Sequence, residues 1–123
     1  MAVTYPSAVK DARLTAVVTA IGATGVLEIG TTGMASVLAT IALNSTAGTA
    51  SAGVLTFSGF PKSDTSADAT GTAAAARIRT ASGGTDIVTG LTVGTSGSDI
   101  NLDSTSITTG QTVTINSATI THA

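Results

Sequence analysis

Apolar residues recur at every second position through most of the chain from residue 26 onward, which is the spacing of a half-buried β-strand. The alternating segments lie at 26–29, 37–43, 55–57, 74–79, 87–93, 100–102, 107 and 113–120. Turn residues separate them at 22–25, 30–33, 48–53, 83–84, 94–97 and 109–110. Short strands at intervals of roughly 8–12 residues predict a mainly β fold, a sandwich or jelly roll.

Three of these segments predict more than a strand. Residues 37–43 are apolar on both faces, so we expect a central strand or an interface strand. Arg77 and Arg79 alternate with apolar neighbours, which predicts one solvated or partner-facing side. The apolar phase shifts at Asn116–Ser117, which predicts a bulge or a turn.

The only predicted helix covers residues 6–21. Pro6 suits a first helical turn, and Gly22 suits the position just after a helix. One side of this helix gathers Leu14, Val17, Val18 and Ile21, and another carries Ala12, Ala16 and Ala20 beside Val9. We expect the first side to pack on a sheet; the alternative is a helix whose alanine strip packs on a partner chain.

Composition restricts the function classes. The length predicts a single β-rich domain over 1–123 with an N-terminal helix. Five basic residues scattered along the chain cannot form the cationic patch of a nucleic-acid binder. Without cysteine there is no disulfide framework, and one histidine cannot build a zinc site of the usual kind. A core of small aliphatic residues with few aromatics favours assembly, so we expect a homo-oligomer.

No membrane or targeting segment is visible in the sequence. No run approaches the ~18 apolar residues of a membrane span, and Lys10, Asp11 and Arg13 interrupt the apolar residues near the N-terminus. We therefore expect no membrane partner and synthesis in the cytoplasm of the producing cell.

The chain offers little for catalysis. His122 is the single imidazole and the penultimate residue, where a solvated or strand-bound role is expected rather than a triad role. Asp64/Asp68 and Asp99/Asp103 are acid pairs four residues apart, which favour turn and capping roles over a cation site. We expect neither an enzyme nor a cofactor.

Residues 58–72 form the longest stretch without strand alternation, and loops of that length are often functional. An aromatic residue in such a loop is either an anchor for a partner or a plug folded back onto its own sheet. The candidate partner-contact residues are Phe60, Pro61, Lys62, Asp64 and Asp68 in this stretch, with Arg77 and Arg79 on the strand that follows.

Five stretches carry a resemblance to a known family. They are TYPSAVKDARLTAVV (4–18), LEIGTTGMASVLATIAL (27–43), FPKSDTSADATGTAAAARI (60–78), GLTVGTSGSDINLDSTSITTGQTVT (90–114) and SATITHA (117–123). They resemble a family of small proteins encoded among the virion structural genes of tailed phages and prophages. The matching runs contain ordinary residues rather than catalytic signatures, so the resemblance assigns no chemistry to any position.

This resemblance implies a virion protein of the phage head, of the capsid cement or decoration type, whose partner is the major capsid protein. Such a protein stabilises the assembled shell by binding it at many identical sites. The alternative is a tail or fibre-associated binding module, although the low aromatic content argues against sugar recognition.

Overall fold

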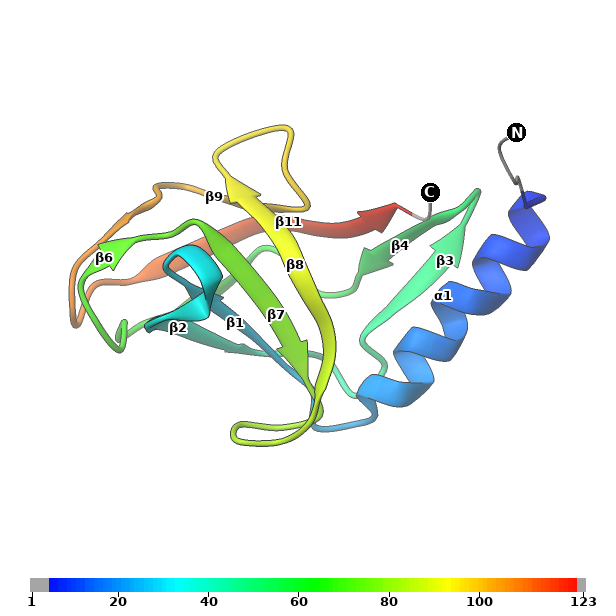
Figure 1. Ribbon diagram of the computed structural model, residues 1–123, viewed down its shortest axis with the longest axis horizontal. Helices are drawn as coiled ribbons and strands as arrows, with labels where there is room; N and C mark the ends of the chain where they lie inside the picture. Colours follow the sequence, from blue (N-terminus) through cyan, green and yellow to red (C-terminus); the bar gives the residue numbers. More distant parts are fainter. Residues whose placement is uncertain (1–4, 122–123) are drawn as a thin grey trace.

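The computed structural model describes residues 5–121 and is mainly β, with one N-terminal α-helix and a curled multi-stranded sheet consistent with a β-sandwich (Figure 1). The predicted fold class is therefore confirmed. The elements are α1 (Ser7–Ile21), β1 (Val26–Gly30), a 3-10 turn at Thr32–Met34, β2 (Val37–Ala42), β3 (Gly48–Ser51), β4 (Val54–Phe57), β5 (Lys62–Asp64), β6 (Gly71–Thr72), β7 (Ala75–Arg79), β8 (Asp86–Gly94), β9 (Ile100–Leu102), β10 (Ser106–Ile107) and β11 (Val113–Thr121).

Helix α1 begins and ends where the sequence predicts. Pro6 occupies the N-cap position, and Gly22 follows the helix with φ 76°, a left-handed value that glycine adopts without strain. The Gly22 N–H donates to the Val18 carbonyl at 3.2 Å and so satisfies one of the last carbonyl groups of the helix.

The main sheet runs in the order β2-β1-β7-β8-β9-β11-β4-β3. β11 organises one half of it, because β9 pairs with one edge while β4 and β5 pair in succession with the other. The register of β11 against β9 shifts between Ile115 and Ser117, so the predicted bulge at Asn116–Ser117 is confirmed.

The sheet curls so that β5, which pairs with β11, lies against β2, the first strand in the order given above. The Asp68 N–H donates to the Leu38 carbonyl at 2.7 Å, and the Thr40 N–H donates to Asp64 Oδ2 at 3.0 Å. These two bonds link the 62–68 segment to β2 and bring the two ends of the ladder together. We call this junction between β2 and residues 59–68 the seam.

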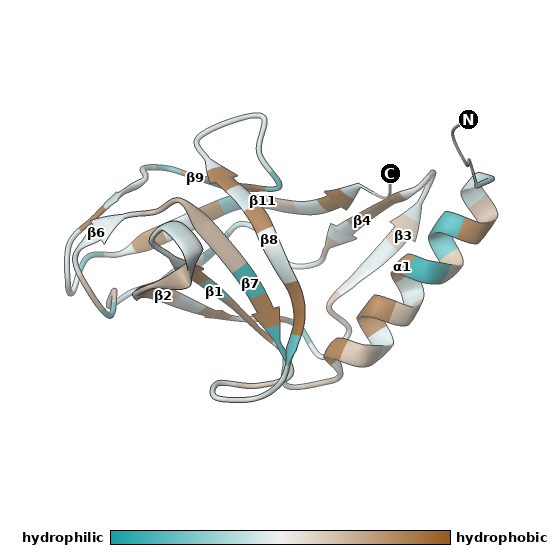
Figure 2. Ribbon diagram, viewed as in Figure 1, coloured by the Kyte–Doolittle hydropathy of each residue, from teal (hydrophilic) through white to brown (hydrophobic). Residues whose placement is uncertain are grey.

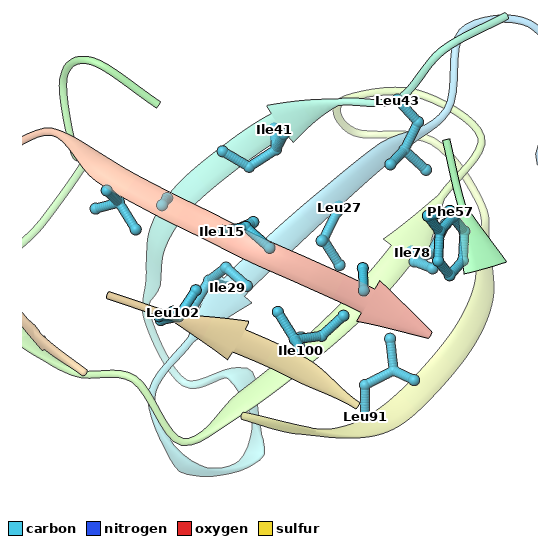
Figure 3. Close-up of a cluster of buried hydrophobic side chains, with 14 of the residues drawn as sticks. Leu27, Ile29, Ile41, Leu43, Phe57, Ile78, Leu91, Ile100, Leu102 and Ile115 are labelled. Atoms are coloured by element: carbon cyan, nitrogen blue, oxygen red, sulfur yellow. The ribbon is translucent and has the colours of Figure 1, made fainter. Parts of the chain in front are cut away.

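The curled sheet encloses the core. Side chains from β1, β2, β7, β8, β9 and β11 converge there, as Figure 3 shows. Leu27, Ile29, Ile78, Ile100 and Ile115 expose 1% of their surface or less. Burying such side chains stabilises a fold by about 1.5–3 kcal/mol each.

Helix α1 packs on the hairpin formed by β3 and β4, at one end of the curled sheet (Figure 1). Leu14 and Ile21 are buried, and Val17 and Val18 pack half-buried against the core, so the predicted inner face of the helix is confirmed. Asp11, in the N-terminal half of the helix, links α1 to the turn between β3 and β4, because its Oδ1 accepts a hydrogen bond from the Gly53 N–H at 2.8 Å.

The structure corrects the sequence-based predictions at three places. Of the two alternatives for 37–43, the central strand is wrong, because β2 ends the ladder and pairs with β1 alone, and the interface strand stays a prediction. Residues 48–53 are not all turn, because β3 occupies Gly48–Ser51 and the turn is at Ala52–Gly53. Residues 58–72 are not an irregular loop, because they contain β5 and β6. In the second case the pairing is local, because β3 forms a hairpin with β4. In the third, pairing of β5 with β11 and of β6 with β10 overrides a sequence rich in turn residues.

Candidate interaction surfaces

The charged residues of the 58–72 stretch form hydrogen bonds across the seam, to β2 and to Asn44 just after it. Asp64 accepts from the Thr40 N–H through Oδ2 and from the Ser66 N–H through Oδ1, both at 3.0 Å. Asp68 accepts from the Thr40 hydroxyl at 3.2 Å. Lys62 Nζ donates to Asn44 Oδ1 at 2.7 Å. Both predicted partner-contact acids and the lysine therefore have intramolecular partners in the described chain.

Phe60 and Pro61 lie between β4 and β5 and differ in exposure. Phe60 is half-buried and packs against the hydrophobic core, which matches the plug that the sequence left as an alternative to a partner anchor. Pro61 is exposed and follows a cis peptide bond. The Lys62 Nζ lies 6.0 Å from the centre of the Phe60 ring.

Arg77 and Arg79 project from β7 beside Glu28 of β1. Arg77 Nε lies 2.6 Å from Glu28 Oε1, and Arg79 Nη1 lies 3.8 Å from the same oxygen. Arg79 Nε also lies 2.8 Å from Asp86 Oδ1. The two arginine side chains are only 21% and 22% exposed, because they cover Glu28, whose side chain is 7% exposed.

The sequence therefore predicted the side of β7 on which these arginines lie, but not their pairing. Glu28 stands in an alternating segment that reads as half-solvated. Its burial follows from β1 lying between β2 and β7, because Thr40 and Arg77 flank Glu28 in register on the same face of the sheet. An acidic residue in one alternating strand and two arginines in another are the signal that could have suggested this ion-pair cluster.

The side of α1 that faces away from the sheet carries a strip of apolar residues that no other part of the described chain covers. Val9 is 40% exposed, and Ala12, Ala16 and Ala20 on the same side are also exposed. Figure 2 shows the strongly hydrophilic segments of α1 in the half nearer the N-terminus. There Arg13 stacks over the Tyr5 ring at 4.4 Å. At helical spacing, Thr19 and Arg13, which are also exposed, border this apolar strip on its two sides.

A second uncovered surface is rich in hydroxyl groups. Thr49 of β3, Thr56 of β4 and Thr119 of β11 are neighbours in register across three strands. The next row contains Ser51, Val54 and Thr121. Four of these six residues, Thr49, Ser51, Thr56 and Thr121, are exposed, and none is charged. This surface can donate and accept hydrogen bonds, but it has no net charge.

Three of the four paired acids, Asp64, Asp68 and Asp99, accept hydrogen bonds within the chain. Asp99 Oδ2 accepts from the Thr92 N–H at 3.0 Å, and Asp103 is exposed. Within residues 5–121 no group of three or more His, Cys, Asp or Glu residues could hold a metal ion, and no pocket is present. His122 lies outside the described residues.

No family model, no curated protein and no solved structure matches the chain. Among the described helices, none has the length and apolar character needed to cross a membrane.

Proposed function

We propose that this chain is a structural protein of a phage particle, a capsid cement protein that binds the head shell and stabilises it. The observation that carries the proposal is the outward face of α1, where Val9, Ala12, Ala16 and Ala20 are exposed on a surface helix. An apolar face of this kind favours a role in assembly, since binding a second surface would remove it from water.

The distribution of charge supports the same role. Glu28, Arg77, Arg79, Asp64 and Lys62 all have partners within the chain. The surface left over is built mainly of alanine, threonine, serine and glycine, whose small side chains lose little conformational entropy when they are covered. The resemblance of the five sequence stretches to virion structural proteins supports the same conclusion, with the major capsid protein as partner and a homo-oligomer on the shell.

Locating the protein on the particle tests this proposal. A cement protein is expected in hundreds of copies over the head, and detaching it should lower the temperature at which the shell breaks open. A few copies at one vertex, or a position on the tail, would contradict the cement role and favour the tail-associated alternative.

A pair of variants on α1 tests the surface itself. Ala16→Glu places a charge on the outward apolar face and should weaken binding to shells at least about tenfold, because that charge would lose its water at the interface. Thr15→Glu is the matched control, since Thr15 is also exposed but lies beside that face. Both variants should keep the melting temperature of the free protein. Equal binding by the two variants would place the interface elsewhere.

A further inference from the structure

Helix α1 contributes little to the core that the curled sheet encloses. Of the 22 buried core residues in the described chain, only Leu14 and Ile21 lie on α1. The other buried residues belong to the strands and to the segments between them, and the seam is closed by hydrogen bonds in which the helix takes no part. The curled sheet can therefore keep its core and its closure when α1 is not packed on it.

The sequence of α1 has few of the features that stabilise a helix by itself. No side chain caps its N-terminus, its first turn has no acidic residue and its last turn has no basic residue. β-branched residues lower helix propensity, because their side chains lose rotamer freedom against the preceding turn. Five of the last seven residues of α1 are of this kind: Thr15, Val17, Val18, Thr19 and Ile21. Isolated helices of about this length are marginal in water, so α1 depends on packing against the sheet.

The contacts that hold α1 in place are confined to one side of the helix. Leu14 and Ile21 are buried on that side, and Val17 and Val18 are half-buried beside them, where α1 packs on β3 and β4. The hydrogen bond from the Gly53 N–H to Asp11 adds a polar link to the same hairpin. The docked helix is thus held by a small set of contacts with a single hairpin and a few with β8.

The two residues that follow the helix can act as a hinge. Gly22 has φ 76°, and a Cβ atom added there would meet no other part of the chain within 4 Å, so packing does not restrain this residue. Ala23 is exposed. The chain is fixed to the sheet again at Thr24, whose hydroxyl donates to the Thr80 carbonyl at 2.9 Å. Rotation at Gly22 and Ala23 would therefore move α1 without disturbing β1.

We propose that α1 is a detachable element, which undocks from the β3–β4 hairpin and unfolds while the curled sheet stays folded. The protein then exchanges between a docked and an undocked form, as expected where one segment has few buried contacts. Undocking uncovers the face of the hairpin opposite Thr49 and Thr56, where Ala50, Leu55 and Ile120 are neighbours in register. Exposing this apolar row keeps the undocked form the minor one.

Docking of the helix would regulate any partner that binds its outward face. That face exists only while α1 is formed, so the apparent affinity of the partner is reduced by the fraction of molecules in the docked form. A bound partner in turn stabilises the docked form by mass action. This consequence rests on the proposed function, whereas the equilibrium itself belongs to the free protein.

Hydrogen exchange of the free protein, followed for single amides by NMR, tests the proposal with two matched leucine variants. Leu27→Ala removes a buried side chain from β1 and weakens the docked and undocked forms alike relative to the unfolded chain. It should speed exchange of the β1 amides at least about tenfold and leave the α1 amides unchanged. Leu14→Ala removes a buried side chain from the helix and should speed exchange of the α1 amides at least about tenfold, because it favours undocking directly.

Equal acceleration of the α1 and β1 amides by Leu27→Ala would overturn the proposal, because the helix would then open only when the whole chain unfolds. Exchange of the α1 amides as slow as that of the β1 amides in the unchanged chain would also overturn it, and this comparison keeps the test decisive if a variant does not fold. Adding shells should slow exchange of the α1 amides alone. Shells that leave α1 exchange unchanged would contradict binding at the outward face, but not the undocking seen in the free protein.

Discussion

β1 and β2 are neighbours in the sheet, yet their other edges are completed in different ways. Beyond β1, β7 pairs along the whole strand, from Val26↔Arg79 to Gly30↔Ala75. Beyond β2, the neighbouring segment contributes the carboxylates of Asp64 and Asp68 and one backbone N–H. Both edges satisfy buried or half-buried backbone groups, as folded proteins require. Strand pairing does so through a repeating ladder, whereas the seam depends on individual side chains.

The difference predicts unequal responses to mutation. Paired strands around the core should tolerate truncation poorly, because each side chain there is packed on several others. The seam should lose less free energy per substitution, because its side chains are partly exposed. It should instead open locally, since solvent-exposed hydrogen bonds with little burial mark the less stable parts of a fold.

Ile29→Ala should have the largest effect. Ile29 is fully buried in the core of the curled sheet (Figure 3). Removing it should lower the free energy of unfolding by about 2–5 kcal/mol, through lost burial and the cavity left behind. Urea denaturation measures this change. Ile87→Ala is the control, since Ile87 is half-buried and should cost less. Equal losses would mean that the packed core is not centred on β1.

Glu28→Gln should come next. The variant leaves Arg77, whose Nε lies 2.6 Å from Glu28 Oε1, without its anionic partner. Because the arginine is about one-fifth exposed, we expect a loss of about 2 kcal/mol, below the 3–5 kcal/mol of a fully buried pair. Asp86→Asn is the matched control: Asp86 is 44% exposed, and exposed ion pairs contribute about 1 kcal/mol or less. A larger loss for Asp86→Asn than for Glu28→Gln would contradict the assigned burial.

The two edges also differ in how well the sequence predicts them. Alternation of apolar residues predicts the strands at β1, β7 and β11, because the period of two is local. The seam is not predictable in this way. It joins Thr40 to Asp64 and Asn44 to Lys62 across about twenty residues of sequence, and no local pattern specifies those pairs.

The candidate contact residues show the same limit. A stretch rich in Ser, Asp, Ala and Thr reads as a loop, so Lys62, Asp64 and Asp68 were expected to face a partner. The structure gives all three intramolecular partners, Asn44 for Lys62 and Thr40 for the two aspartates, and a contact with another protein at these residues stays a prediction. Residue type predicted that these side chains would engage something, but only the tertiary structure shows what they contact.

Asp64→Ala should have a smaller effect on global stability and a clear local one. It removes the acceptor of the Thr40 N–H and should cost about 1–2 kcal/mol. Lys62 is the only trypsin site between Arg13 and Arg77, so trypsin reports opening of the seam. Because cleavage follows the population of the open form, a loss of 1 kcal/mol should speed cutting after Lys62 about fivefold.

Asp103→Ala is the control for the seam, since Asp103 is an exposed acid outside it and should change cleavage little. The unchanged chain should be cut slowly after Lys62, because β5 is paired with β11. Rapid cutting of the unchanged chain would show that the seam is open in solution. Identical cleavage of the two variants would show that Asp64 does not hold the seam closed.

Ala52→Asn should have the smallest effect and the opposite sign. The turn between β3 and β4 places Ala52 at φ 52° and Gly53 at φ 78°. Two successive positive φ values are typical of the tight turn that prefers Asn-Gly, and alanine is strained at the first position. Asparagine should raise the free energy of unfolding by about 0.5 kcal/mol, because it tolerates this backbone conformation. Ala52→Val should lower it, since a β-branched side chain is disfavoured at positive φ. One local substitution can thus raise the stability of this hairpin, whereas the stability of the seam depends on residues distant in sequence. Destabilisation by asparagine together with a neutral valine would show that the turn does not hold Ala52 in the left-handed region.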